Sequence, residues 1–166
     1  MTILGMSLAA FTQFHVTLSL IGIASGLVVV LAMLSSQRLN AVAPVFLTST
    51  ALTSLTGFLF PFHGITPGIV VGLLSMLLLA VAILARYPFH LAGPWRATYV
   101  VTSVMALWFN VFIFIVQSFE KIPALHALAP TQSEAPFKIV QLAALLLFFI
   151  LGIFAVRKFH PRTLAA

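Results

Sequence analysis

The stretch YVVTSVMALWFNVFIFIVQSFEK, residues 99–121, is almost entirely apolar and exceeds the ~20 residues that a helix needs to cross a bilayer. Asn110 and Gln117 lie inside it, and their separation of seven residues places both amides on one face of a helix. Unpaired amides are costly in lipid. We therefore expect this face, which also carries Tyr99 and Ser103, to turn toward other helices.

The composition of the whole chain makes the same prediction. Of its 166 residues, 62% are hydrophobic and 6% are charged, and the mean hydropathy is +1.21. A soluble domain carries about 25% charged residues, and a chain this short could not hide so much apolar surface from water. The net charge of +6 is scattered between apolar runs, which argues against nucleic acid as a partner. The absence of cysteine excludes disulfides and thiolate metal sites.

Five stretches are apolar enough to be membrane spans: residues 14–34, 43–62, 66–86, 96–119 and 136–157. They predict an all-α integral membrane protein in which residues 1–166 form one transmembrane domain, a compact antiparallel bundle of five helices. The segment before the first span lacks the charged region of a signal peptide, so we expect it to be retained. Thr131 and Glu134 have capping-box spacing, which predicts that the last helix begins there.

The distribution of Lys and Arg predicts the orientation of the helices. One side would carry six basic residues and the other side two: Arg38, Arg86, Arg96, Arg157, Lys158 and Arg162 against Lys121 and Lys138. Because cytoplasmic loops are enriched in Lys and Arg, we expect the N-terminus outside and the C-terminus in the cytoplasm.

The segments WRATYVV and LWFNVFIFIVQSFEKIPALHALAPTQSEAPF, both within residues 95–137, resemble small bacterial inner-membrane proteins of uncharacterised function. The resemblance covers about a quarter of the chain. It implies a multi-pass protein of the bacterial inner membrane, with the lipid bilayer as its surroundings, and it carries no activity with it.

Polar side chains other than hydroxyls gather at the predicted external end of the bundle. Asn110, Gln117 and Gln141 would orient a small apolar or amphipathic ligand in a site that opens outward, and His15 and His63 would lie at its rim. A few polar groups inside an apolar bundle are typical of a ligand site. The amides could equally be structural, bonded across to neighbouring helices.

The histidines allow a second function. Imidazole binds zinc, copper and iron, and it can hold haem as an axial ligand. His15, His63 and His126 could therefore form a metal or haem site of a redox protein, although their spacing matches no known ligand pattern. No pattern pairs a nucleophile with a base, which favours a binding protein over an enzyme.

The small residues allow a third function, that of an accessory subunit in a larger membrane complex or a homo-oligomer. Gly22 with Gly26, and Gly68 with Gly72, have the spacing that lets membrane helices approach closely. We expect these contacts to form mainly within the chain. The run TSTALTSLT, residues 48–56, is rich in hydroxyls that we expect to bond to their own helix backbone.

Overall fold

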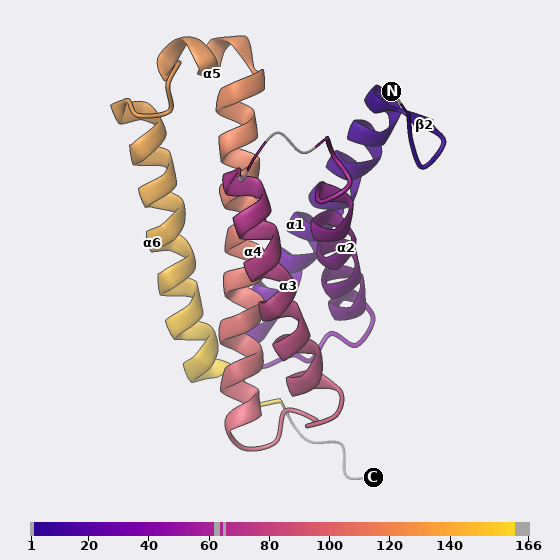
Figure 1. Cartoon of the computed structure of the whole chain (residues 1–166). Helices are drawn as coiled ribbons and strands as arrows, with labels where there is room; N and C mark the ends of the chain where they lie inside the picture. The colour runs from indigo at the N-terminus through magenta and orange to yellow at the C-terminus, as the bar shows by residue number, and fades with distance from the viewer. Residues whose placement is uncertain (1, 62–63, 65, 162–166) are drawn as a thin grey trace.

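The regular structure is almost entirely helical in a computed structural model, which describes residues 2–61, 64 and 66–161 (Figure 1). The helices are α1 (Leu8–Leu34), α2 (Val42–Gly57), α3 (Pro67–Arg86), α4 (Pro94–Lys121), α5 (Pro123–Leu128) and α6 (Ala135–Lys158). A small hairpin of β1 (Thr2–Ile3) and β2 (Met6–Ser7) precedes them, and nothing in the sequence pattern indicated it.

Within the described residues, four helices are long and apolar enough to cross a membrane: α1, α3, α4 and α6. The all-helical fold predicted from the sequence is therefore confirmed. The first helix is longer than predicted, because it begins at Leu8, where the Ser7 hydroxyl accepts a hydrogen bond from the Ala10 N–H at 3.2 Å. The second is shorter than predicted, because α2 ends at Gly57. Its 16 residues make about 24 Å of helix at ~1.5 Å per residue.

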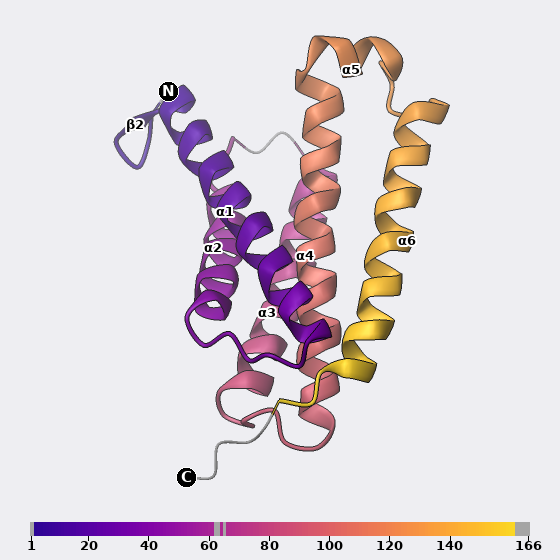
Figure 2. The same ribbon diagram turned by 180° about the vertical axis from the view of Figure 1, so that it is seen from behind.

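The long helices run in alternating directions, so their termini collect at two ends of the molecule (Figures 1 and 2). We call the end where α1, α3 and α6 finish the arginine end, and the end with α5 and the hairpin the α5 end. Helix α4 lies at the centre and contacts α1, α3 and α6, while α2 packs mainly on α1. Leucine, isoleucine and phenylalanine side chains cover the outer faces, and Ile139 and Phe149 are each 65% exposed. Such faces are expected where lipid is the solvent.

Glycine allows a close helix crossing at the first pair, as its spacing predicted. A Cβ added to Gly26 would lie 2.7 Å from the Leu107 side chain and 2.8 Å from the Phe46 ring, so no larger residue fits there without a shift. The prediction for the second pair is wrong. A Cβ on Gly68 would meet only Thr66, and Gly72 packs on the ring of Phe58 from the loop after α2 rather than on another helix.

The capping-box residues before α6 contact one another, but they do so outside the helix. The Glu134 carboxylate accepts hydrogen bonds from the N–H and hydroxyl of Thr131, at 3.2 and 2.9 Å, and from the Ser133 N–H at 3.0 Å. Desolvation raises the pKa of Glu134, but these hydrogen bonds outweigh it, so the pKa lies below its usual value. The helix begins only at Ala135, with Glu134 itself at the N-cap. The predicted start at Thr131 is therefore wrong by one turn.

At the arginine end, Arg86 joins three segments of the chain. Its side chain is 2% exposed, and Nη2 donates to the Leu39 carbonyl at 3.2 Å and to Asn40 Oδ1 at 3.1 Å. Nη1 donates to the hydroxyl of buried Tyr99 at 3.3 Å. Arg38 in turn donates to the Arg86 carbonyl at 3.4 Å. These bonds tie the α1–α2 loop to the end of α3 and the start of α4.

A second arginine fixes the end of α6. Arg96 Nη1 donates to the carbonyls of Val156 and Phe159, at 2.8 and 2.7 Å, which are among the carbonyls that a helix leaves free at its C-terminus. The His160 N–H then donates to the Ser36 hydroxyl at 2.8 Å, which connects α6 to the α1–α2 loop. Hydrogen bonds therefore cross between the helices throughout the arginine end.

Candidate functional site

A cavity of about 670 Å³ lies toward the α5 end between α1, α2, α3 and α4. Figure 2 shows α1 leaning away from α4 toward this end, and the cavity occupies the region where the helices diverge. Its volume is within the range of ~300–1,000 Å³ that is typical of small-molecule sites. The polar residues that line it are Thr12, His15, Ser19, Thr50, Thr53, Ser54, Thr66, Ser75, Asn110, Gln117, Ser118 and Lys121. Leucine, isoleucine, valine and phenylalanine provide most of the remaining surface.

Asn110 lies at the buried part of the cavity wall, with 8% of its surface exposed. The Ser19 hydroxyl donates to Asn110 Oδ1 at 2.9 Å. This hydrogen bond identifies the oxygen of the amide, so the other atom is the NH₂ nitrogen, Nδ2. Among the residues that the structure describes, Nδ2 has no hydrogen-bond partner. A buried polar group without a partner costs about 1–3 kcal/mol, and Nδ2 is enclosed by the described residues without such a partner.

Thr50 is another cavity-lining residue with a buried polar atom that has no partner in the described structure. The neighbouring hydroxyls of α2 confirm the structural prediction, because Ser49, Thr53 and Thr56 each donate to the carbonyl four residues earlier, at 2.6–2.8 Å. Thr50 is 2% exposed, and its Oγ1 makes no hydrogen bond in the described part of the chain. Sequence reasoning did not single out Thr50, because a run of hydroxyls does not indicate which member faces a cavity.

Gly22 of α1 brings these two groups to the same point. A Cβ added there would lie 2.9 Å from Asn110 Nδ2 and 2.9 Å from Thr50 Oγ1. Both groups therefore approach the bare backbone of α1 from α4 and α2. The glycine spacing predicted close packing at this position, but not that the helix would leave room for two polar groups.

His15 lies one turn before Ser19 on α1 and also lines the cavity. Its Nδ1 is 2.8 Å from Thr56 Oγ1, and the Thr56 hydroxyl hydrogen is already donated to the Leu52 carbonyl at 2.7 Å. Thr56 therefore accepts from Nδ1–H, which leaves Nε2 of the neutral ring as an acceptor. The ring meets Phe60 edge-on, with centroids 5.2 Å apart, so an aromatic contact and a hydrogen bond both fix its position.

Gln117 and Lys121 line the cavity near the end of α4. Gln117 Nε2 donates to Glu120 Oε2 at 3.3 Å, and Lys121 Nζ lies 4.0 Å from Glu120 Oε1. These side chains are exposed, and exposed ion pairs contribute at most about 1 kcal/mol. They give the mouth of the cavity a polar border without closing it.

The structure does not bring Gln141 to this cavity. Its Nε2 donates to the Phe112 carbonyl at 3.2 Å, so it lies between α6 and α4 instead. His126 is on α5 and does not line the cavity, and His63 lies outside the described residues. Among residues 2–61, 64 and 66–161, no three His, Asp or Glu side chains gather where they could hold a metal ion. A metal or haem site at these histidines stays a prediction, as does assembly into a larger complex.

The cavity therefore offers a small set of groups to a ligand. His15 lines it with an acceptor, and Asn110 and Thr50 line it as residues whose unpartnered donor and hydroxyl are enclosed in the wall, all within a largely apolar surface. No carboxylate is among the described residues that line it. This arrangement is suited to holding a molecule by shape and hydrogen bonds. No family model, curated protein or solved structure matches this chain.

Proposed function

We propose that this chain is a five-span protein of the bacterial inner membrane that binds a small amphipathic molecule in the cavity at the α5 end. The observation that carries the proposal is the pair of buried, unpartnered polar groups on Asn110 and Thr50, which meet at Gly22. In an apolar bundle both groups would otherwise lose their hydrogen bonds to water without replacement. A ligand atom that bonds to them would remove this cost.

The charges support the orientation within the membrane. Among the described residues, the arginine end carries Arg38, Arg86, Arg96, Arg157 and Lys158, and the α5 end carries Lys121 and Lys138. An excess of basic residues is typical of the cytoplasmic side. The cavity would then open to the outside. Helix α2 would be the fifth span, its short length completed by the residues that follow Gly57.

The positions of the polar groups define the ligand that we propose. Its buried end carries a hydrogen-bond acceptor, such as a carbonyl or hydroxyl oxygen, that bonds to Asn110 Nδ2. A donor on the ligand would face Nε2 of His15, since His15 and Ser19 are one turn, about 5.4 Å, apart along α1. The rest of the molecule is apolar and contacts residues such as Phe60 and Phe109. No charged group on the ligand is needed.

Mass spectrometry of the protein purified in mild detergent tests this proposal. Wild-type protein is expected to retain a small molecule, and Asn110→Leu is expected to lose it. Gln141→Leu is the matched control, because it removes a half-buried amide that lies between helices but outside the cavity. Equal retention of the molecule by both variants would contradict the proposal. So would wild-type protein that is purified from cells without a bound molecule and takes none up from a lipid extract.

A further inference from the structure

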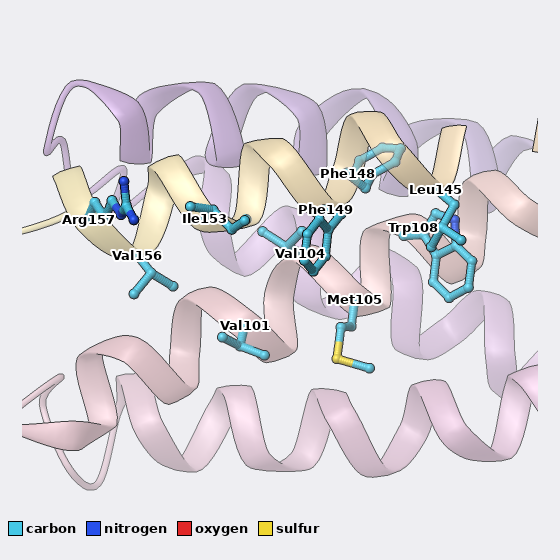
Figure 3. A pocket seen from close by; sticks show the side chains of 11 residues that line it. Val101, Val104, Met105, Trp108, Leu145, Phe148, Phe149, Ile153, Val156 and Arg157 are labelled. Carbon is cyan, nitrogen blue, oxygen red and sulfur yellow. The ribbon is translucent and has the colours of Figure 1, made fainter. Parts of the chain in front are cut away.

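A second hollow of about 500 Å³ lies between α4 and α6, on the side of the molecule away from the cavity described above (Figure 3). Apart from Arg157 at one end, the side chains that line it are apolar or aromatic. We propose that this groove binds an acyl chain of an anionic phospholipid, whose headgroup is held by Arg157. The inference rests on the proposed membrane topology but not on the ligand proposed for the cavity, because the two sites share no lining residue.

The groove has the length and shape for an acyl chain. Along α6 it runs from Leu145 to Arg157, about 18 Å at ~1.5 Å per residue, which is slightly more than half of a ~30 Å hydrocarbon core. Gly152 keeps the middle open, since an added Cβ would already lie 3.5 Å from Val104 on the opposite wall. Figure 3 shows Phe149 and Met105 along the same channel, with Trp108 at the end far from Arg157.

The charge at the end of the groove is not balanced by the protein. Three other arginines at this end donate to carbonyls of neighbouring segments: Arg38, Arg86 and Arg96. Within the described part of the chain, the exposed side chain of Arg157 makes no hydrogen bond or ion pair with another side chain or carbonyl. The two acidic side chains of the sequence, Glu120 and Glu134, both lie at the α5 end. Among the described residues no carboxylate lies near Arg157, so an external anion can serve as its counterion.

An anionic headgroup fits this role better than a zwitterionic one. Lys158 follows Arg157, so the end of α6 carries two adjacent positive charges. A zwitterionic headgroup would bring its own cation toward them, whereas a net negative phosphate diester would not. Basic pockets between membrane helices on the cytoplasmic side are known to hold anionic lipids. Arg157 can also bond to phosphate through two N–H groups.

Trp108 provides a direct reporter of the chain in the groove. The sequence has two tryptophans, and Trp95 stacks on Phe89 at 3.9 Å outside the groove, so Trp95→Phe leaves Trp108 as the single fluorophore. This variant is reconstituted into phosphatidylcholine vesicles with a minor fraction of brominated phosphatidylglycerol or brominated phosphatidylcholine. The anionic quencher is expected to reduce Trp108 fluorescence more than its zwitterionic counterpart at equal mole fraction. Equal quenching by the two lipids overturns the proposal.

Two charge variants in the Trp95→Phe background distinguish lipid binding at Arg157 from a general attraction of anionic lipids to the positive surface. Arg157→Gln is expected to lower the preference for the anionic lipid about fivefold, the effect of one basic residue near a membrane surface. Lys158→Gln removes the same charge beside the groove but not from its lining, and its effect should be about twofold or less because exposed charges are screened. Equal losses in the two variants would assign the preference to the surface potential and overturn the proposal.

Gly152→Leu tests the acyl chain without altering any charge. The larger side chain fills the middle of the groove, so it is expected to abolish the preferential quenching of Trp108. Helical circular dichroism of each reconstituted variant is compared with that of the Trp95→Phe parent. If Gly152→Leu is folded and still shows the full preference, the lipid lies outside the groove and the proposal is wrong.

Discussion

Both ends of the molecule contain buried polar side chains, but their hydrogen bonds differ. At the arginine end, Arg86 is nearly fully buried, yet its two terminal nitrogens bond to Leu39, Asn40 and Tyr99. Toward the α5 end, the buried NH₂ of Asn110 and hydroxyl of Thr50 have no partner among the described residues. The comparison teaches that polarity inside this bundle has two uses. One end uses most of it to hold helices together, although Nε of Arg38 and Nε of Arg86 have no partner within the described residues, and the other leaves two polar groups without a partner in a cavity wall.

Removal of Arg86 should produce the largest effect on stability. Arg86→Met leaves the buried Tyr99 hydroxyl and Asn40 Oδ1 without this donor, while the Leu39 carbonyl keeps the hydrogen bond from the Ala43 N–H, and each hydrogen bond to a charged group contributes about 1.5–3 kcal/mol. We expect a loss of roughly 3 kcal/mol or more, measured as a fall in the thermal midpoint in detergent. Arg157→Met, at the exposed end of the other groove, should change stability by no more than about 0.5 kcal/mol. Similar effects for the two variants would contradict the structural role of Arg86.

Substitution of the two glycines of α1 should distinguish a glycine that is needed for helix packing from one that is needed for ligand binding in the cavity. Gly26→Ala presses against Leu107 and Phe46 in the core and should cost about 1–3 kcal/mol of stability. Gly22→Ala instead presses on Asn110 Nδ2 and Thr50 Oγ1, so its main effect should be the loss of the retained ligand. Thermal unfolding and mass spectrometry of both variants provide the two measurements. Ligand retained in Gly22→Ala would show that the polar pair is not the binding point.

Asn110→Leu should show whether Asn110 contributes to ligand binding without contributing to the stability of the protein. The substitution removes an unpartnered buried donor, at the cost of the bond from Ser19. In ligand-free protein the two terms nearly offset, so we expect the free energy of unfolding to change by less than about 1 kcal/mol. A residue kept for binding at no gain in stability is typical of a functional site. A loss as large as that of Arg86→Met would instead make Asn110 a structural residue.

The smallest expected effect is at Glu134, in the turn before α6. Because its pKa in the folded protein lies below the usual value, Glu134 stabilises the turn at pH values above the unfolded pKa. This contribution is lost as the pH falls below about 4. As the pH falls through this range, the protection of the Thr131 and Ser133 amides against hydrogen exchange should decrease. The Glu134→Gln variant should show no such decrease in protection. An identical pH profile in both proteins would exclude the carboxylate as the cause.

The sequence predicted the helices well because their signal is local. Runs of apolar residues of spanning length identified α1, α3, α4 and α6, and the seven-residue spacing placed Asn110 and Gln117 on one face, where both line the cavity. The end of α2 was harder to predict, because the apolar residues after Gly57 continue the pattern without continuing the helix.

The contents of the cavity were less predictable, because they depend on how the helices rotate about their axes. Helix α6 is apolar on all sides, so the sequence could not tell that Gln141 turns toward Phe112 and away from Asn110. Thr50 lies in a run of hydroxyls, and only its position opposite Gly22 distinguishes it. Ser49 and Thr50 are both buried, and that Ser49 has a hydrogen-bond partner while Thr50 has none among the described residues is a property of the assembled bundle.

Experimental density for the protein purified in mild detergent, at a resolution that shows bound molecules, tests the central claim most directly. We predict a single elongated molecule in the cavity, with one of its oxygen atoms within hydrogen-bond distance of both Asn110 Nδ2 and Thr50 Oγ1. Density that instead shows these two groups bonded to each other, with the space between α1 and α4 closed, would contradict it.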